Sequence, residues 1–245
     1  MLERLQKIIS ASGLMSRRAA EKLIGEGHVC VNGIKAGIGD KADPETDSIT
    51  IDGCPLSVQT EKQYYVLNKP AGYVTTMHDE KERKNVSFLM KGVKSRVYPV
   101  GRLDMYSEGL LIMTNDGELS NALMHPKTNI VKTYCVTVAY GALTNIRDAA
   151  AIMRKPIEID GAITHPAKVE ILSTDAENLE AELKVSISEG RNRQIRKLCE
   201  NAGLRVRKLL RVSEGPIELG DLESGRWRKL TDTELVALRK AAGIG

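Results

Sequence analysis

One acidic residue, Asp104, stands out as a candidate for catalysis. It is the only acid between residues 97 and 107, and Arg102 lies two positions before it. Gly101 and Gly109 lie on either side, and glycine permits backbone conformations and close approaches that side chains forbid. The pattern predicts a loop that presents a single carboxylate to a ligand.

A strongly basic segment follows later in the chain. Between residues 191 and 211, eight basic residues stand against a single acid, Glu200. The basic residues are Arg191, Arg193, Arg196, Lys197, Arg205, Arg207, Lys208 and Arg211. This concentration is more informative than the formal net charge of +4, which many proteins with other partners share. A lone carboxylate and an arginine-rich segment together indicate chemistry on a phosphate-bearing polymer.

The end of this segment alternates apolar and basic residues, which is the pattern of a strand with two different faces. One face would carry Leu204, Val206, Leu210 and Val212, and the other Arg205, Arg207 and Arg211. We expect an apolar inward face and a cationic outward row that follows a phosphate backbone without reading sequence. Because the chain has one Trp and one Phe, we do not expect extensive aromatic stacking on single strands.

The rest of the composition indicates an ordinary globular protein. An apolar share of 42% is enough for a core, and no apolar run approaches the roughly twenty residues that cross a bilayer. The N-terminal residues lack the apolar core of a signal peptide. Cysteines and histidines are scattered, and no Gly-rich phosphate loop, H-E-x-x-H helix or cofactor fingerprint is present. We expect a cytoplasmic protein with no membrane segment, no metal and no cofactor.

Residues 1–60 predict a small domain of two helices and hairpins. Apolar residues recur with helical spacing at the start of the chain, and Ser16 is the expected N-cap of a second helix over residues 17–26. The dipeptides Asn32-Gly33 and Asp52-Gly53 predict hairpin turns, because a type I′ turn needs positive φ at both central residues.

Three basic residues of the second predicted helix are candidate RNA ligands: Arg17, Arg18 and Lys22. Cations in the first turn of a helix are mildly destabilising, because the free N–H groups there already carry partial positive charge. The functional explanation is that these N–H groups and the guanidinium groups bind phosphate together. The alternative is a pair of solvated arginines on a surface helix.

After a polar linker at Pro55–Lys62, strand and helix patterns alternate, which predicts a mixed α+β class. Strands are expected at residues 64–67, 109–113, 133–138 and 183–187. Helices are expected at residues 86–91, 118–123, 144–153, 191–202 and 231–242. We therefore expect two domains, residues 1–60 and residues 61–245.

Several motifs occur together in a characteristic order. They are residues 67–72, residues 101–104 followed by 107–117, residues 132–134, and residues 190–191 followed by 194–196. This set resembles the ribosomal RNA pseudouridine synthases of the RsuA/RluB branch, over about residues 64–230. Tyr106 departs from the pattern, because many relatives carry a small acidic or amide residue there. Near the N-terminus, the Ser-Arg-Arg-Ala and Val-x-Val-Asn-Gly segments resemble the S4 RNA-binding module.

The resemblance implies both a fold and an activity. The fold would be a small N-terminal S4-like α/β domain followed by a catalytic domain with a largely antiparallel sheet and a central cleft. The activity would be isomerisation of a specific uridine in ribosomal RNA, free or in a pre-ribosomal particle, by a monomer that needs no cofactor. Residues 215–222 and 225–228 look closer to the large-subunit RluB type than to the small-subunit RsuA type.

The resemblance also implies roles for individual residues. Asp104 would be the catalyst, acting as a nucleophile on the sugar or base or as a base that removes a ribose proton. Arg196 would be its ionic partner, and Tyr134 would pack on the flipped base. Arg102 would fill the gap left by the extruded nucleotide or bind phosphate, and Lys132 is a further expected RNA contact.

Two other functions fit parts of the sequence. If Asp104 only caps a turn, the protein is a noncatalytic RNA-binding assembly factor. If Asp104 and Glu108 form a carboxylate pair, it is a glycosidase or nucleosidase, which leaves the basic segment and the N-terminal module without a role. The corresponding structural interpretations are a half-buried strand residue for Tyr134 and a solvated helix face for Arg196.

Overall fold

The computed structural model describes residues 1–57 and 61–244. The chain divides into two compact units. One contains residues 1–63, 92–98 and 114–117, and the other contains residues 64–91, 99–113 and 118–245. The domain boundary predicted after residue 60 and the middle of the predicted linker lie outside the described residues. Within the described ranges, every helix is too short or too polar to cross a lipid bilayer.

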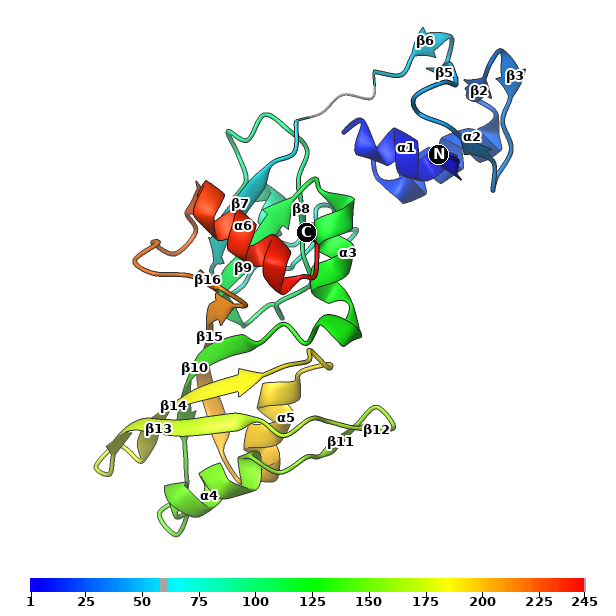
Figure 1. Cartoon of the computed structure of the whole chain (residues 1–245). Helices are drawn as coiled ribbons and strands as arrows, with labels where there is room; N and C mark the ends of the chain where they lie inside the picture. Colours follow the sequence, from blue (N-terminus) through cyan, green and yellow to red (C-terminus); the bar gives the residue numbers. More distant parts are fainter. Residues whose placement is uncertain (58–60, 245) are drawn as a thin grey trace. The chain divides into compact units, whose positions relative to one another are not determined.

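The N-terminal part of the first unit consists of two helices and short strands (Figure 1). The helices are α1 (Leu5–Ala11) and α2 (Arg17–Glu26), and the strands are β1 (Glu3–Arg4), β2 (Val29–Val31), β3 (Ile34–Lys35), β4 (Lys41–Ala42), β5 (Ile49–Ile51) and β6 (Cys54–Pro55). The Ser16 side chain caps α2 by accepting from the backbone N–H of Ala19 at 3.1 Å, as predicted. Positive φ values of 52° at Asn32 and 81° at Gly33 form the predicted turn between β2 and β3.

The core of this unit comes from the apolar faces of both helices and the inward side of the strands. It contains Leu5, Ile8, Ile9, Ala20, Ile24, Val29, Ala36, Ala42 and Ile49, all buried. This small core leaves Arg17, Arg18 and Lys22 of α2 exposed. The helix therefore places its basic residues on the surface, where the sequence predicted them.

The second unit is organised around a nine-stranded sheet. Its main path runs β13 (Lys168–Asp175), β14 (Glu180–Ile187), β10 (Lys132–Ala139), β15 (Arg205–Glu214), β9 (Glu108–Thr114), β7 (Tyr64–Lys69) and β17 (Trp227–Lys229). Strand β16 (Ile217–Glu218) pairs with β15, and β8 (Tyr98–Pro99) pairs with β9. The β13–β14, β14–β10, β10–β15, β15–β16 and β7–β17 pairs are antiparallel, and β15–β9 is parallel. The predicted α+β class with a largely antiparallel sheet is confirmed.

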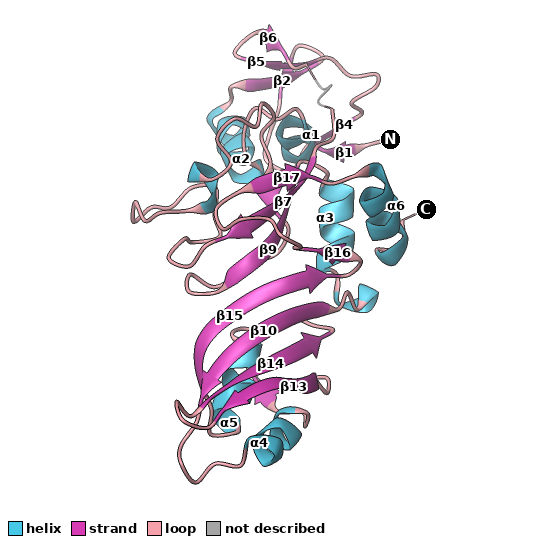
Figure 2. Cartoon of the chain, turned by 90° about the vertical axis from the view of Figure 1, so that its left-hand side faces the viewer, coloured by secondary structure: helices cyan, strands magenta, loops and turns pink. Residues whose placement is uncertain are grey.

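Helices α4 (Ile146–Met153) and α5 (Gln194–Asn201) lie against one face of β13, β14, β10 and β15 (Figure 2). A two-stranded ribbon of β11 (Glu158–Ile159) and β12 (Ala162–Ile163) lies between them in sequence. The predicted start of α5 at residue 191 is wrong, because Arg193 has a left-handed φ of 53° that ends the loop before the helix. The helix predicted at residues 86–91 is only a 3₁₀ turn, Val86–Phe88, in which the backbone N–H of Ser87 donates to the Asn85 side chain at 3.0 Å.

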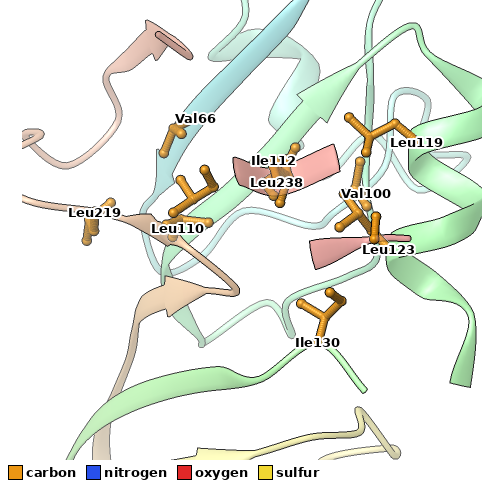
Figure 3. Close-up of a cluster of buried hydrophobic side chains, with 11 residues drawn as sticks. Val66, Val100, Leu110, Ile112, Leu119, Leu123, Ile130, Leu219 and Leu238 are labelled. Atoms are coloured by element: carbon orange, nitrogen blue, oxygen red, sulfur yellow. The ribbon is translucent and has the colours of Figure 1, made fainter. Parts of the chain in front are cut away.

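A second apolar core lies at the other end of the sheet, between β7 and β9 and the helices α3 (Gly117–Met124) and α6 (Asp232–Ala241) (Figure 3). It is made of Val66, Val100, Leu110, Ile112, Leu119, Leu123, Ile130, Ile217, Leu219, Leu238 and Ala242. Alternate residues of β9 enter this core, and the residues between them are buried on the other face of the strand. Burial on both faces explains the continuous apolar run of β9. The predicted helices in this region are present within one residue at each end.

Strand β15 departs from the simple alternation that its sequence predicts. Against β10, Val206 pairs with Val138 and Lys208 pairs with Thr137, so Arg207 is an extra residue in a β-bulge. A bulge shifts the inward and outward positions that follow it by one residue. Leu209 and Arg211 consequently point inward and are buried, and a second bulge at Val212 brings Glu214 to the same buried face, while Arg205, Arg207 and Lys208 stay exposed. The predicted outward placement of Arg211 as an RNA ligand is wrong for this reason.

The parallel contact between β15 and β9 depends on Gly109, which pairs with Arg211. A Cβ on Gly109 would lie 2.2 Å from the carbonyl oxygen of Arg211, and its φ is +101°. No side chain fits between two backbones at that distance. The absence of a side chain at position 109 therefore lets the two strands meet.

Gly109→Ala is expected to destabilise the protein by more than about 3 kcal/mol, because it adds backbone overlap to an unfavourable φ. Gly161→Ala is the matched control, because Gly161 has a similar positive φ of +77° but no atom near its Cβ position. It should cost about 1–2 kcal/mol. Urea-unfolding free energies of both variants measure the difference, and equal losses would contradict the close-approach argument.

Candidate active site

The loop of residues 101–108, here called the Asp104 loop, is held by hydrogen bonds to its backbone. Gly101 takes a φ of 72°, and β9 begins where the loop ends. The buried Thr75 hydroxyl donates to the carbonyl of Leu103 at 2.6 Å and accepts from the N–H of Leu103 at 3.2 Å. Both backbone groups of the residue before Asp104 are thereby satisfied by one side chain, which fixes the direction of the carboxylate.

The other side of the loop rests on the turn that follows β7. The N–H of Gly72 donates to the carbonyl of Met105 at 2.7 Å. The Lys69 ammonium reaches the same carbonyl at 3.3 Å and the carbonyl of Pro70 at 2.9 Å. One cation thus ties the end of β7 to the residue immediately after Asp104.

Lys69 is completely buried, which is unusual for a lysine. Burial lowers its pKa from 10.5 to about 8, although the charges of Glu108 and Asp104 raise it. Its Nζ therefore lies beneath the Asp104 loop as a partly compensated positive charge. Lys69 belongs to the motif at residues 67–72 and no role was predicted for it, although a lysine at the end of an apolar strand was a usable signal.

Asp104 opens into a cleft of about 670 Å³ within the second unit. Its lining includes Thr75, Arg102, Asp104, Lys132, Tyr134, Arg191, Arg193 and Gln194, with Met77, Leu123 and Met124 among the apolar members. The Asp104 side chain is 36% exposed, so its carboxylate is accessible from the cleft. Glu108, the second acid of the glycosidase hypothesis, is not among the described residues that line this cleft.

Two arginines approach the Asp104 loop from the segment before and within α5. Arg193 Nη1 lies 3.7 Å from Asp104 Oδ2, and its left-handed backbone turns its side chain toward the loop. Arg196 Nη2 instead donates to the carbonyl of Tyr106 at 2.9 Å. The ion pair predicted for Arg196 is therefore made by Arg193, because the helix begins after Arg193 and changes the direction of both side chains.

Arg196 nevertheless contributes to the electrostatics of the site. Its pKa is lowered by burial and by neighbouring Arg193, and raised by the charge of Asp104. Guanidinium groups remain protonated at neutral pH, so both arginines supply positive charge beside a single carboxylate.

The segment that carries Arg193 is held by a separate network around Glu189. The Glu189 carboxylate accepts from the N–H of His165 at 2.6 Å, from Gln194 Nε2 at 3.1 Å and from Arg191 Nε at 3.0 Å. The buried Gln194 in turn accepts from the N–H of Arg191 at 3.1 Å. These bonds offset the conformational cost of a left-handed arginine, because they fix the chain on both sides of it.

The floor of the cleft is formed by β10 and β15. Tyr134 is 7% exposed, and burial raises the pKa of its hydroxyl. Glu214 Oε2 lies 3.2 Å from Arg211 Nη2, and Glu214 Oε1 lies 3.8 Å from Lys132 Nζ. Tyr134 and Lys132 are thus in the cleft as predicted from their motif, whereas Glu214 was not singled out in the sequence.

The remaining predicted RNA ligands fall into two groups. Arg102 is exposed at the cleft, and Arg191 is half-buried there. Arg205 and Arg207 are exposed on β15 and do not line the cleft, and Arg207 lies 3.7 Å from Glu180. The expected continuous cationic row is therefore interrupted by the bulge and by a neighbouring acid.

A family model described as RNA pseudouridylate synthase matches residues 63–201, and an S4 domain model matches residues 3–47. The chain belongs to the RNA pseudouridine synthase family, as its motifs indicated.

Relatives cover nearly the whole chain. It is 40% identical over 246 residues to "Ribosomal large subunit pseudouridine synthase B" of Bacillus subtilis, covering 100% of this chain and 98% of the relative. The chain is also 39% identical over 243 residues to an uncharacterised RNA pseudouridine synthase of Aquifex aeolicus, and the match covers 98% of this chain and 95% of the relative. A crystal structure of a pseudouridylate synthase is similar with a TM-score of 0.66 and 30% identity, covering 96% of this chain and 99% of that one.

Because Lys69 is buried, the free energy of unfolding should vary with pH in the alkaline range. A folded-state pKa of about 8, against 10.5 for an ordinary lysine, means that unfolding takes up a proton between these values. The unfavourable burial of charge is present below pH 8 and is relieved as the pH rises. The contribution of Lys69 to the free energy of unfolding should therefore increase from about pH 8 to pH 10.

Urea unfolding of wild type and Lys69→Met at several pH values between 7 and 10 measures this contribution. The wild type should gain stability relative to Lys69→Met as the pH rises. Lys168→Met, which removes an exposed lysine, is the control and should follow the wild type. Identical pH slopes for wild type and Lys69→Met would contradict the assignment.

Proposed function

We propose that this protein converts a specific uridine of large-subunit ribosomal RNA to pseudouridine, with Asp104 as the catalyst and without a cofactor. The observation that carries the proposal is the position of Asp104 on a loop whose backbone is fixed by Thr75, Gly72 and Lys69. The large-subunit substrate is supported by the name and 40% identity of the Bacillus subtilis relative.

The cleft supplies the groups that this exchange needs. The C1′–N1 bond of the uridine breaks, the uracil turns, a C1′–C5 bond forms, the C5 proton leaves and N1 takes up a proton, so that the net change is an isomerisation. Asp104 promotes the exchange, and Arg193 and Arg196 keep positive charge beside it. Tyr134 packs on the flipped base, and the exposed Arg102 occupies the space that the base leaves or binds phosphate.

The division of labour between domains is part of the proposal. Residues 1–60 act as an S4 RNA-binding domain, and residues 61–245 act as the catalytic domain. Arg17, Arg18 and Lys22 contact phosphate from α2, while Lys132, Arg191, Arg193, Arg205 and Arg207 do so from the catalytic domain. The protein works in the cytoplasm as a monomer on ribosomal RNA or a pre-ribosomal particle.

The direct test is incubation of the purified protein with unmodified large- and small-subunit ribosomal RNA, followed by mapping of pseudouridine at single-nucleotide resolution. Wild type should modify one site in the large-subunit RNA. Asp104→Asn should lose at least about 1,000-fold in rate, because it removes the reacting carboxylate but keeps the shape. Its fold is checked by its urea-unfolding transition.

Other outcomes separate the alternatives. Full activity of Asp104→Asn would contradict the catalytic assignment. Binding of both RNAs by wild type without modification of free RNA or of a pre-ribosomal particle would favour an assembly factor. Release of free uracil would favour the nucleosidase.

RNA binding by α2 predicts a charge-specific loss of affinity. Arg17→Ala/Arg18→Ala should weaken binding to ribosomal RNA and make log K less steep against log salt by about 1–2, because two phosphate contacts disappear. Lys35→Ala/Lys41→Ala removes two exposed cations of the same domain and is the control. Filter binding at several salt concentrations measures both, and equal slopes for the two double variants would contradict a specific role for α2.

A further inference from the structure

We propose that Arg211 and Glu214 are positioning residues that hold the Tyr134 hydroxyl on the floor of the cleft. The inference rests on the proposed function, because it concerns the residue that packs on the target base. It also reassigns Arg211, which the sequence placed among the RNA ligands. Three features of the buried Arg211 guanidinium support this role: its neighbours, its charge balance and its contact with the strand that follows the Asp104 loop.

Arg211 and Tyr134 are direct cross-strand partners on β15 and β10. Register shifts occur on both sides of this segment, so Arg207 and Val212 are both extra residues in β15. The bulge at Arg207 turns Arg211 to the inward face, beside the buried Tyr134 ring. Burial lowers the pKa of the Arg211 guanidinium, whereas the neighbouring Glu214 and Tyr134 raise it above its ordinary value.

The chemistry of this pair limits how the Tyr134 hydroxyl can be oriented. A guanidinium has donors only, so a Tyr134 oxygen that faces Arg211 can only accept, and its own hydrogen then points away from Arg211. Burial raises the pKa of Tyr134, so the phenol keeps that hydrogen at neutral pH. Arg211 therefore fixes Tyr134 as a neutral donor with a defined orientation at the cleft.

The Glu214 carboxylate offsets the desolvation cost of the buried Arg211 guanidinium. Arg211 is 1% exposed and Glu214 is also 1% exposed, and their charged atoms lie 3.2 Å apart. Lys132 Nζ lies on the other carboxylate oxygen at 3.8 Å. A buried ion pair of this kind is often no more stabilising than well-packed apolar residues, so stability alone does not account for the Arg211–Glu214 pair. The need to orient Tyr134 accounts for its presence.

Arg211 also connects the floor to the Asp104 loop. Its Nε donates to the carbonyl of Leu110 at 2.7 Å, and its backbone meets Gly109. Both residues belong to β9, directly after the Asp104 loop. One side chain thus sets the position of Tyr134 relative to the strand that carries Asp104.

The test uses the full chain and the double variant Arg211→Met/Glu214→Met, which removes both charges together and avoids leaving one of them buried alone. It should unfold at nearly the urea concentration of the wild type. Its kcat for pseudouridine formation should fall about 10- to 100-fold, with KM for the RNA changed less than about twofold. A matched control is Arg228→Met/Glu234→Met, which removes a half-buried pair at 2.7 Å between β17 and α6.

A double-mutant cycle separates positioning from a purely structural role. In a Tyr134→Phe background the same two methionine substitutions should lower kcat by less than about threefold, because the hydroxyl that they orient is already missing. If the two methionine substitutions lowered kcat by the same factor with Tyr134 as with Phe at that position, the proposal would be overturned. The control pair should lose stability, because it removes part of the cap of α6, but should keep kcat.

A second readout does not depend on catalysis. Tyrosines labelled with ¹³C at Cζ give seven resonances, and Tyr134→Phe identifies the one from Tyr134. Arg211→Met/Glu214→Met should shift or split that resonance, whereas the control pair should leave it unchanged. An unchanged Tyr134 resonance would overturn the positioning role even if activity fell. If wild type modified no RNA while the resonance moved, the proposed function would fail and the positioning of Tyr134 would stand.

Discussion

The contact between β9 and β15 is the constraint on which the rest of the catalytic unit depends. It is a parallel pairing with only two registered residue pairs, Leu210 with Glu108 and Arg211 with Gly109. On one side of it the sheet packs against α4 and α5, and on the other against α3 and α6. The two parts of the sheet form a single surface only because Gly109 brings the backbones together.

The active site lies at this contact for a geometric reason. The Asp104 loop enters β9, and Tyr134 belongs to β10, the antiparallel neighbour of β15. Residues that are far apart in the chain therefore meet across one junction. Hydrogen bonds from Lys69 and Thr75 hold the backbone of the loop beside the cleft.

Charged groups surround the Asp104 carboxylate and its loop. Arg193 and Arg196 come from above the loop, Lys69 lies beneath it, and Arg211 and Glu214 compensate one another in the floor. Each buried charge carries a desolvation cost, and each is matched by backbone carbonyls or an opposite charge. The N-terminal domain follows another rule, because its basic residues on α2 are exposed and its apolar core is small. A modest net charge of +4 is thus compatible with local RNA-binding surfaces.

The sequence by itself determined the features that depend on neighbouring residues. The Ser16 cap and the Asn32-Gly33 turn follow from local rules of hydrogen bonding and backbone conformation. The motifs around Asp104 also identified the family. Only the tertiary structure decided the placement of Arg211 and the choice of Arg193 over Arg196, because a bulge and a left-handed residue each redirect the side chains that follow. Lys69, Thr75 and Glu214 acquire their roles through contacts between distant segments, where the energy of burial and long-range hydrogen bonds outweighs any preference that the local sequence records.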